Sequence, residues 1–274
     1  MTRALVTGSK GFIGKNLLEK IKKDFQVFEL NEEIFDVDSW SNILSLLLVG
    51  MKPSVVFHVG ACSDTMEMNV NYMMTRNFES TKIISDYCKE NDIPLIFSSS
   101  AASYGTNNLY PSNLYGWSKY VAEQYVIANG GIGLRYFNVY GPGEELKGHM
   151  SSVANQMYVK YKSGEEIKLF PKNPTRDFVY VKDVIDANIF AYENYKELSG
   201  EYYDVGSGES KSFEEVLNIM EIPFSYHPDW MIPEGYQFFT CSDKTKWMTE
   251  WKPNYTLENG LKEYLKYLND YQYK

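Results

Sequence analysis

The feature that most constrains this 274-residue chain is a glycine-rich turn between a strand pattern and a helix pattern. Residues 4–7 form an apolar strand pattern, residues 12–23 an amphipathic helix pattern, and GSKGFIG joins them. Glycines let the backbone turn tightly and approach a pyrophosphate, which the free N–H groups of the helix N-terminus stabilise. The turn therefore predicts a dinucleotide-binding loop. Its expected contact residues are Gly8, Lys10, Gly11, Phe12, Ile13 and Gly14.

The pattern beyond this loop indicates an α/β fold. Short β-branched runs alternate with longer helical patterns over the first two-thirds of the chain, which is typical of a doubly wound parallel sheet of the Rossmann type. Buried strands are predicted at residues 26–30, 54–59, 94–98 and 132–135, with a short strand segment just before Asp36. Residues 178–181 and 202–205 are expected to return to the sheet.

The regular alternation loosens after Gly141-Pro142-Gly143, where segments rich in proline and aromatic residues follow. We therefore expect two parts, the second smaller and discontinuous. The first is a dinucleotide-binding domain of residues 1–143 plus about 177–205. The second is a substrate-binding domain of about 144–176 plus 206–274.

The composition excludes several classes of protein. A net charge of −9 disfavours a broad nucleic-acid footprint or an anionic-membrane surface. Three widely spaced cysteines, Cys62, Cys88 and Cys241, suggest neither a disulfide framework nor a zinc site, so no metal is expected. The N-terminus enters a strand directly, and no apolar run has the length of a signal peptide or membrane span. These features predict a cytoplasmic protein.

The adenosine end of the predicted site leaves the cofactor open between NAD and NADP. Glu29, near the end of the second strand, would accept from a ribose 2′-OH and favour NAD. Lys10 would instead pair with a 2′-phosphate and favour NADP, unless it is a solvated loop lysine. Asp36 is either an adenine contact or an N-terminal cap for the helix that follows Ser39.

A tyrosine and a lysine predict redox chemistry. Tyr115 and Lys119 lie four residues apart at the start of a predicted helix and share one face. A tyrosine pKa of about 10 makes the phenol a poor base at neutral pH. We expect the Lys119 ammonium and a positive nicotinamide ring to lower that pKa, and Lys119 to hold ribose hydroxyls. Ser100 ends a buried strand at the ligand-binding edge, where it would bond the hydroxyl that Tyr115 deprotonates.

These motifs, in this order and with GxxGxxG spacing, resemble the extended short-chain dehydrogenases that modify nucleotide sugars. The resemblance covers nearly the whole chain. Its segments are HVGACSDT (58–65), NYMMTRN (71–77), SSAASYG (99–105), RYFNVYGP (135–142), KGHMSSVA (147–154), KLFP (168–171), RDFVYVKDV (176–184) and EGYQFFTCSD (234–243). The YFNVYGP, KG–M–SVA and GYQ–F–T runs are the narrower ones, and they are similar to the epimerases that act at C6 of ADP-linked glycero-manno-heptose.

The resemblance implies further roles and a ligand. The ligand would be a nucleotide-diphosphate sugar, and the NAD or NADP would be tightly bound in a homo-oligomer. Bound NAD(P)⁺ would take hydride from a sugar carbinol and return it to the other face. Lys147 would be a second acid–base group, Asn138 would lie beside the sugar, and Arg176 and Tyr236 would bind the diphosphate and nucleotide. His149 and Gln156, also near the substrate, stand where the family usually has Ser and His.

Two loops are shorter than in the heptose epimerases, at residues 30–36 and 105–115, so a related sugar or nucleotide remains an alternative ligand. The rival enzymes are a nucleotide-sugar 4-epimerase, a ketoreductase, or a 3,5-epimerase of the GDP-fucose synthase kind. That last kind has a cysteine and a histidine where Ala102 and Lys147 stand here. A 4,6-dehydratase would need an acidic pair at Ala101-Ala102. A non-catalytic NAD(P) sensor is disfavoured because such proteins typically lose the Tyr–Lys pair.

Overall fold

The computed structural model describes residues 1–106, 110–232 and 237–270, and it confirms the expected α/β class. Its centre is a six-stranded parallel sheet with the order β2-β1-β3-β4-β5-β9. The strands are β1 (Thr2–Thr7), β2 (Phe25–Leu30), β3 (Val55–His58), β4 (Leu95–Ser100), β5 (Ile132–Tyr136) and β9 (Tyr202–Val205). Every residue of β3 and β5 is buried, as expected for strands covered on both faces.

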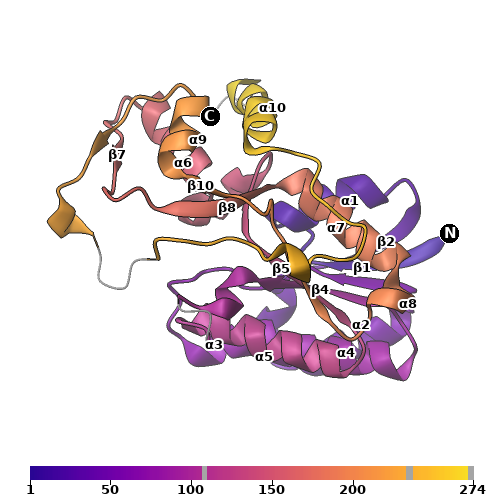
Figure 1. The fold of residues 1–274 in the computed structure, drawn as a ribbon. Coiled ribbons are helices and arrows are strands. Elements are labelled where there is room, and N and C mark those ends of the chain that lie inside the picture. Colours follow the sequence, from indigo (N-terminus) through magenta and orange to yellow (C-terminus); the bar gives the residue numbers. More distant parts are fainter. Residues whose placement is uncertain (107–109, 233–236, 271–274) are drawn as a thin grey trace.

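Helices cover both faces of this sheet (Figure 1). One face carries α1 (Phe12–Ile21) and α7 (Val181–Glu193), which pack on each other and on a core that includes Val6 and Phe57. The other face carries α2 (Trp40–Met51), α4 (Ser80–Glu90) and α5 (Leu114–Ala128) over a core around Phe97.

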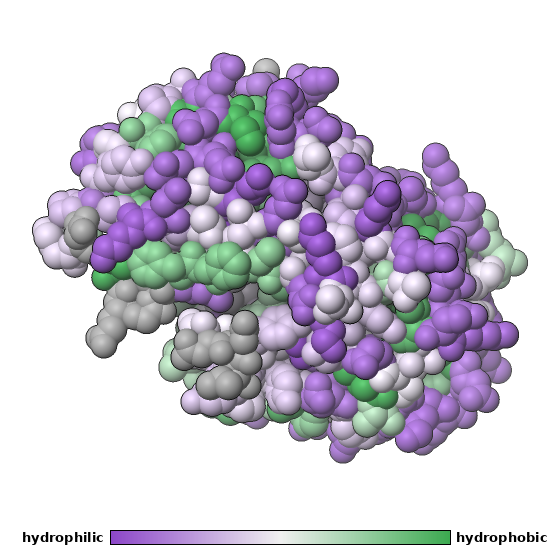
Figure 2. Space-filling model, viewed as in Figure 1, coloured by the Kyte–Doolittle hydropathy of each residue, from purple (hydrophilic) through white to green (hydrophobic). Residues whose placement is uncertain are grey.

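The strand order reverses between β1 and β3, which lie side by side in the sheet. Ligands of doubly wound sheets bind at such a switch point, beyond the carboxyl ends of the strands. In Figure 1 the N-terminus lies on the right, and the strands of the parallel sheet run from right to left, so their carboxyl ends lie on the left. Figure 2 shows a notch in the surface at that left side, between the two parts of the molecule.

The second part has its own core, rich in aromatic side chains such as Tyr140, Phe178 and Tyr264. Its strands are β6 (Asn138–Tyr140), β8 (Thr175–Tyr180) and β10 (Ser210–Ser212) in one sheet, and β7 (Lys168–Leu169) with β11 (Ser225–Tyr226) in another. Its helices are α6 (Val153–Lys162), α9 (Phe213–Ile219) and α10 (Leu257–Asp270). The chain also forms two short α-helices, α3 (Val70–Met74) and α8 (Tyr195–Leu198).

Two expectations about strands were wrong. Residues 178–181 do not return to the central sheet, because Phe178 pairs with Asn138 of β6 and the strand ends at Tyr180. The segment before Asp36 is a 3-10 helix, Glu32–Asp36, whose only buried side chain is Ile34. The chain there anchors one apolar residue in the core instead of adding a strand. The division into two domains stays a prediction.

Among the described residues, we find no helix with both the length and the apolar character required to cross a membrane.

Candidate active site

The glycine loop lies at the switch point, as its sequence pattern predicts. Gly8 has φ of +64°, and a Cβ there would lie 2.9 Å from the Gly60 backbone nitrogen at the end of the neighbouring strand. A Cβ on Gly14 would lie 2.1 Å from the Gly8 carbonyl oxygen, so only glycine lets α1 start this close to β1. The N-cap of α1 is Gly11, which has no side chain to cap the first N–H groups.

This loop fits a dinucleotide pyrophosphate, because the uncapped N–H groups and the positive end of the helix dipole attract an anion. Gly11 and Lys10 are exposed, whereas Phe12 is buried and Ile13 packs against the core. Phe12 and Ile13 therefore anchor the helix by their side chains, and only their backbone can serve a cofactor.

At the end of the site where adenosine is expected, hydrogen bonds join the glycine loop to the end of β2. The Ser9 hydroxyl donates to Glu29 Oε2 at 2.5 Å and lies 3.1 Å from Asn31 Oδ1. The backbone N–H of Lys10 donates to the same Asn31 oxygen at 3.0 Å. The Lys10 ammonium forms an ion pair with Glu33, and the hydrogen bond to Glu33 raises the pKa of Lys10 above its usual value.

Asp36 is exposed at the end of the 3-10 helix, and the N-cap of α2 is Ser39. The alternative in which Asp36 caps α2 is therefore wrong, and its role toward adenine stays a prediction.

Helix α5 presents the predicted tyrosine and lysine to the carboxyl edge of the sheet. The N-cap residue Asn113 accepts a hydrogen bond from Gly116 N at 2.8 Å, which sets the start of the helix. Lys119 is 4% exposed, and its ammonium donates to Ser98 O at 2.9 Å and Gly60 O at 3.1 Å. Burial lowers the pKa of Lys119 to about 8. Lys119 thus links β4, the segment after β3 and α5.

Ser100 and Tyr115 are brought together as expected. Ser100 is the last residue of β4, and its hydroxyl lies near enough to the Tyr115 phenol to lower the pKa of that phenol, while it accepts from Ala102 N at 3.1 Å. Burial raises the pKa of Tyr115, and the Ser100 hydrogen bond opposes only part of that rise. The expectation of a lowered pKa is therefore wrong for the protein on its own. The Lys119 ammonium donates to backbone carbonyls, while desolvation disfavours the phenolate.

Sequence reasoning missed the side chains that surround Lys119. His58 lies between the hydroxyls of Thr7 and Thr81, at 2.6 and 2.8 Å. Burial, and then the charge of Lys119, lower the pKa of His58 to about 3, so the ring is neutral. The signal was a histidine inside the apolar run SVVFHV, where a polar side chain needs buried partners.

Cys62 was also missed. Its backbone N–H and carbonyl both bond the Asn77 side chain, at 2.9 and 3.0 Å, and Asn77 reaches Ser118 Oγ at 2.8 Å. These bonds hold the segment after β3 against α5. Burial raises the pKa of the Cys62 thiol, which also interacts electrostatically with Lys119.

The residues expected beside the sugar and diphosphate lie on the second part. Asn138 donates to Asp177 O and Thr240 Oγ1, both at 3.2 Å. Arg176, next to Asp177 on β8, donates to Thr175 O at 2.9 Å, and its guanidinium lies 5.5 Å from the Phe213 ring. The fully buried Asp177 carboxylate ties β8 to residues 207, 208 and 242.

The 3-10 helix Glu144–Met150 carries Lys147 and His149. Burial lowers the pKa of Lys147, against the opposing charge of Glu144. His149 is exposed, and Gln156 Nε2 donates to its carbonyl at 3.1 Å and to Ser151 O at 2.7 Å. The Gln156 amide thus supports this turn. Tyr236 lies outside the described residues.

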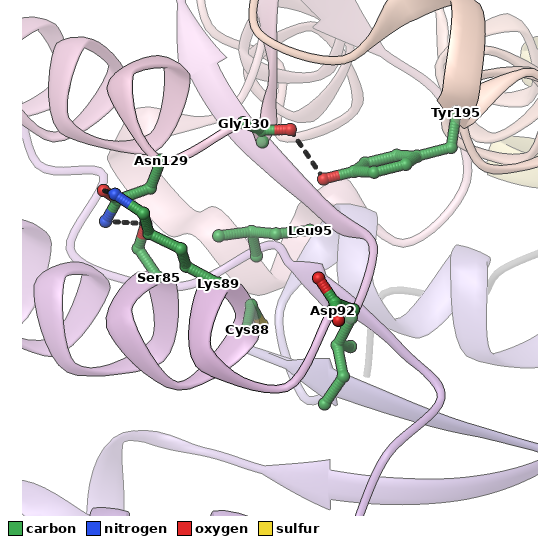
Figure 3. Close-up of a pocket in the computed structure, with 10 residues that line it drawn as sticks. Ser85, Cys88, Lys89, Asp92, Leu95, Asn129, Gly130 and Tyr195 are labelled. Carbon is green, nitrogen blue, oxygen red and sulfur yellow. Dashed lines mark hydrogen bonds between the residues drawn. The ribbon is translucent and has the colours of Figure 1, made fainter.

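Cavities of about 240 and 830 Å³ open at the opposite, amino edge of the sheet. The smaller one lies between α4, the start of β4 and Tyr195 (Figure 3). Two of its polar side chains already have partners: Asn129 Nδ2 donates to Ser85 Oγ at 3.1 Å, and the Tyr195 hydroxyl donates to the backbone carbonyl of Gly130 at 2.8 Å. We therefore assign no chemistry to it.

Comparisons with known proteins agree with this geometry. The model of the NAD dependent epimerase/dehydratase family matches residues 4–206. The chain is 26% identical to the ADP-L-glycero-D-manno-heptose-6-epimerase of Helicobacter pylori, with a TM-score of 0.84, over 98% of this chain and 97% of that one. Its fold also matches the UDP-glucose 4-epimerase of Thermotoga maritima (24% identity, TM-score 0.84, 98% and 99% covered). The fold of the UDP-N-acetylglucosamine 4-epimerase of Methanobrevibacter ruminantium matches too, with 23% identity and a TM-score of 0.84, over 98% of this chain and 98% of that one.

Proposed function

Because the chain belongs to the NAD-dependent epimerase/dehydratase family, we propose that it inverts a carbinol centre of a nucleoside-diphosphate sugar by transient oxidation and re-reduction. Membership of this family confirms that the protein is an enzyme of the short-chain dehydrogenase type. It also confirms the expected nicotinamide dinucleotide as cofactor. The observation that carries the proposal is the assembly of Ser100, Tyr115 and Lys119 at the carboxyl edge of the sheet, next to the glycine loop.

The proton chemistry follows from these side chains. When bound, the nicotinamide dinucleotide supplies the hydride acceptor and donor. Tyr115 removes the hydroxyl proton of the sugar, and Ser100 orients that hydroxyl through its own hydrogen bond. The Lys119 ammonium, buried beside the segment after β3, holds the ribose hydroxyls. Burial raises the pKa of Tyr115, and a positively charged nicotinamide ring, when bound, would oppose that rise.

A second acid–base group is needed because the hydroxyl points elsewhere once the transient carbonyl compound has turned over in the pocket. We assign this role to Lys147. Burial lowers the pKa of its ammonium, so Lys147 gives up a proton more readily than a solvated lysine and is the neutral amine for a larger fraction of the time.

The substrate we propose is ADP-linked glycero-manno-heptose, inverted at C6, with Asn138 beside the sugar and Arg176 and Tyr236 at the diphosphate and nucleotide. The narrower sequence runs and the 26% identity to the Helicobacter pylori heptose epimerase support this choice. A 4-epimerase acting on a UDP-sugar is the alternative.

The test is NMR of the purified protein with ADP-D-glycero-D-manno-heptose deuterated at C6. We expect the C6 epimer with the deuteron retained, because hydride leaves and returns within one site. Exchange with solvent hydrogen would contradict oxidation and re-reduction. Turnover of UDP-glucose instead of the heptose would remove the heptose assignment and keep the epimerase.

Tyr115→Phe should lower turnover by about 10²–10⁴-fold, the usual contribution of a positioned acid–base group. Tyr125→Phe is the matched control, since Tyr125 lies on the same helix and its hydroxyl donates to Asp86 at 2.7 Å. If Tyr115→Phe matched wild type with every nucleotide sugar tested, the catalytic proposal would fail and a sensor would be favoured.

A further inference from the structure

The 3-10 helix Glu144–Met150, which carries Lys147, is tied at both ends by one carboxylate. Glu144 is 0% exposed. Its Oε1 accepts from the Gly141 backbone N–H, before the helix, at 3.2 Å, and from Ser152 Oγ, after the helix, at 2.8 Å. Its Oε2 accepts from the Ser152 backbone N–H at 2.6 Å. The Glu144 side chain therefore joins the chain on the two sides of this helix.

The same segment is fixed to the dinucleotide-binding helix α1. Asn16 Nδ2 donates to the carbonyl of Pro142 and to that of Phe12, both at 2.9 Å. Gly143, the N-cap of the 3-10 helix, has φ of +95°, and a Cβ there would lie 3.3 Å from Asn16 Nδ2. The start of the helix that carries Lys147 is thus held against the first turns of α1.

The groups that bond Glu144 show that it is a carboxylate. Two backbone N–H groups donate to it, and so does the Ser152 hydroxyl, which itself accepts from Asn155 N at 3.3 Å. Burial raises the pKa of Glu144, and the bonds from Ser152 and Gly141 oppose that rise. A side chain that receives only donors is held in its ionised form. Glu144 therefore brings a desolvated negative charge to the helix that carries Lys147.

Lys147 is the cation on which this charge acts. Burial lowers the pKa of the Lys147 ammonium, and the charge of Glu144 opposes that fall. Tyr140 on β6 and Tyr264 on α10 are fully buried phenols near Glu144, and burial raises the pKa of Tyr140. His149, on the same 3-10 helix, is exposed. Within the described part of the chain, Glu144 is thus the charged side chain that acts on Lys147.

Resting on the function proposed above, we infer that Glu144 is the positioning residue of the second proton transfer: it fixes the turn that presents Lys147 to the sugar and keeps Lys147 protonated until the carbonyl is reduced. The carbonyl carbon then receives the hydride back, and the carbonyl oxygen takes a proton from Lys147 Nζ. The N–H electron pair stays on Nζ, which is left as a neutral amine. Solvent restores its proton, and Tyr115 releases the one that it removed.

The first test measures Lys147 directly and needs no turnover. The protein is labelled with acetic anhydride over a range of pH, and acetylation of Lys147 is followed by peptide mass spectrometry, because only the neutral amine reacts. In Glu144→Gln the midpoint of this titration should move to lower pH by roughly half a unit to one unit. An unchanged midpoint would overturn the inference and leave the proposed function intact.

Glu145→Gln is the matched control. It makes the same change of charge on the next residue, whose carboxylate accepts instead from the Tyr267 hydroxyl at 2.8 Å. It should leave the Lys147 midpoint where it is in wild type. A shift as large as that of Glu144→Gln would show that Glu144 has no special role.

The second test is the pH profile of kcat with the sugar that the protein turns over. In Glu144→Gln the alkaline limb should move to lower pH together with the Lys147 midpoint, whereas Glu144→Asp keeps the charge and should restore the limb at a lower kcat. A lower kcat with an unmoved limb in Glu144→Gln would reduce Glu144 to a support of the fold. Absence of turnover in wild type would instead contradict the proposed function, and the labelling result would still stand.

Ser152→Ala tests the positioning even if Glu144→Gln does not fold. It keeps the charge and removes one of the three bonds to Glu144. We expect kcat to fall by roughly threefold to tenfold, the equivalent of about one net hydrogen bond, with KM and the Lys147 midpoint unchanged. A kcat equal to that of wild type would overturn the positioning role.

Discussion

Two lysines at the two ends of the proposed cofactor site show opposite behaviour. Lys119, at the redox end, is 4% exposed, bonds two backbone carbonyls, and has its pKa lowered by burial. Lys10, at the adenosine end, is exposed, pairs with Glu33, and has its pKa raised. The same side chain is thus a desolvated charge in one place and a solvated, paired charge in the other.

The largest difference should appear in turnover. Lys119→Met is expected to lower kcat by about 10²–10⁴-fold, because the buried charge that holds the ribose and supports the phenolate is lost. Lys10→Met should change kcat by less than about fivefold, since its solvated pair does not touch the reacting atoms. Steady-state kinetics with the sugar identified by NMR measure both. Similar losses in the two variants would remove the distinction.

A buried and an exposed ion pair should likewise differ in how much they contribute to stability. Glu123 and Arg135 form a bidentate pair at 2.6 and 2.9 Å, with side chains 0% and 4% exposed. Glu123→Gln should lower the free energy of unfolding by about 3–5 kcal/mol, because it leaves the Arg135 charge buried without its counter-ion. Glu33→Gln, which breaks the exposed pair with Lys10, should leave the urea midpoint unchanged. A comparable shift in both midpoints would mean that burial does not separate the two pairs.

The buried lysine should also make stability depend on pH. Its pKa of about 8 in the folded protein lies below the usual 10.5, so between these values the unfolded chain binds more protons. The contribution of Lys119 to the free energy of unfolding therefore rises with pH across this window, by about 3 kcal/mol in total. Below pH 8 the full penalty of burying the ammonium is present.

The measurement is the difference in unfolding free energy between Lys119→Met and wild type from pH 7.5 to pH 10.5. This difference should shrink as pH rises, because other titrating groups cancel in the subtraction. Lys10→Met is the control and should show no such trend. A flat difference for Lys119→Met would contradict the lowered pKa.

The smallest effect on binding is expected from removing the hydrogen bond between the glycine loop and β2. Ser9→Ala removes the hydroxyl that donates to Glu29 at 2.5 Å. Binding of NAD should weaken by about fivefold, the equivalent of one net hydrogen bond. Calorimetry measures this, and tighter binding in the variant would show that the bond withholds Glu29 from the ribose.

Local patterns in the sequence predicted the features that depend on local geometry. The glycine turn lies between β1 and α1 because Gly14 leaves no room for a Cβ beside Gly8, a constraint contained within seven residues. Tyr115 and Lys119 share a helix face because the helical period sets that face. The strand patterns also predicted most of the central parallel sheet.

Only the tertiary structure decided which distant groups meet. An apolar run shows that residues 178–180 are buried, yet it does not say that they pair with β6 instead of β5. Lys10 pairs with Glu33, 23 residues away, which no local pattern in the sequence indicated. The pKa of Tyr115 rises because of desolvation, which depends on every segment packed around the phenol. Periodicity is a property of one segment, whereas strand partners, ion pairs and desolvation are properties of the folded whole.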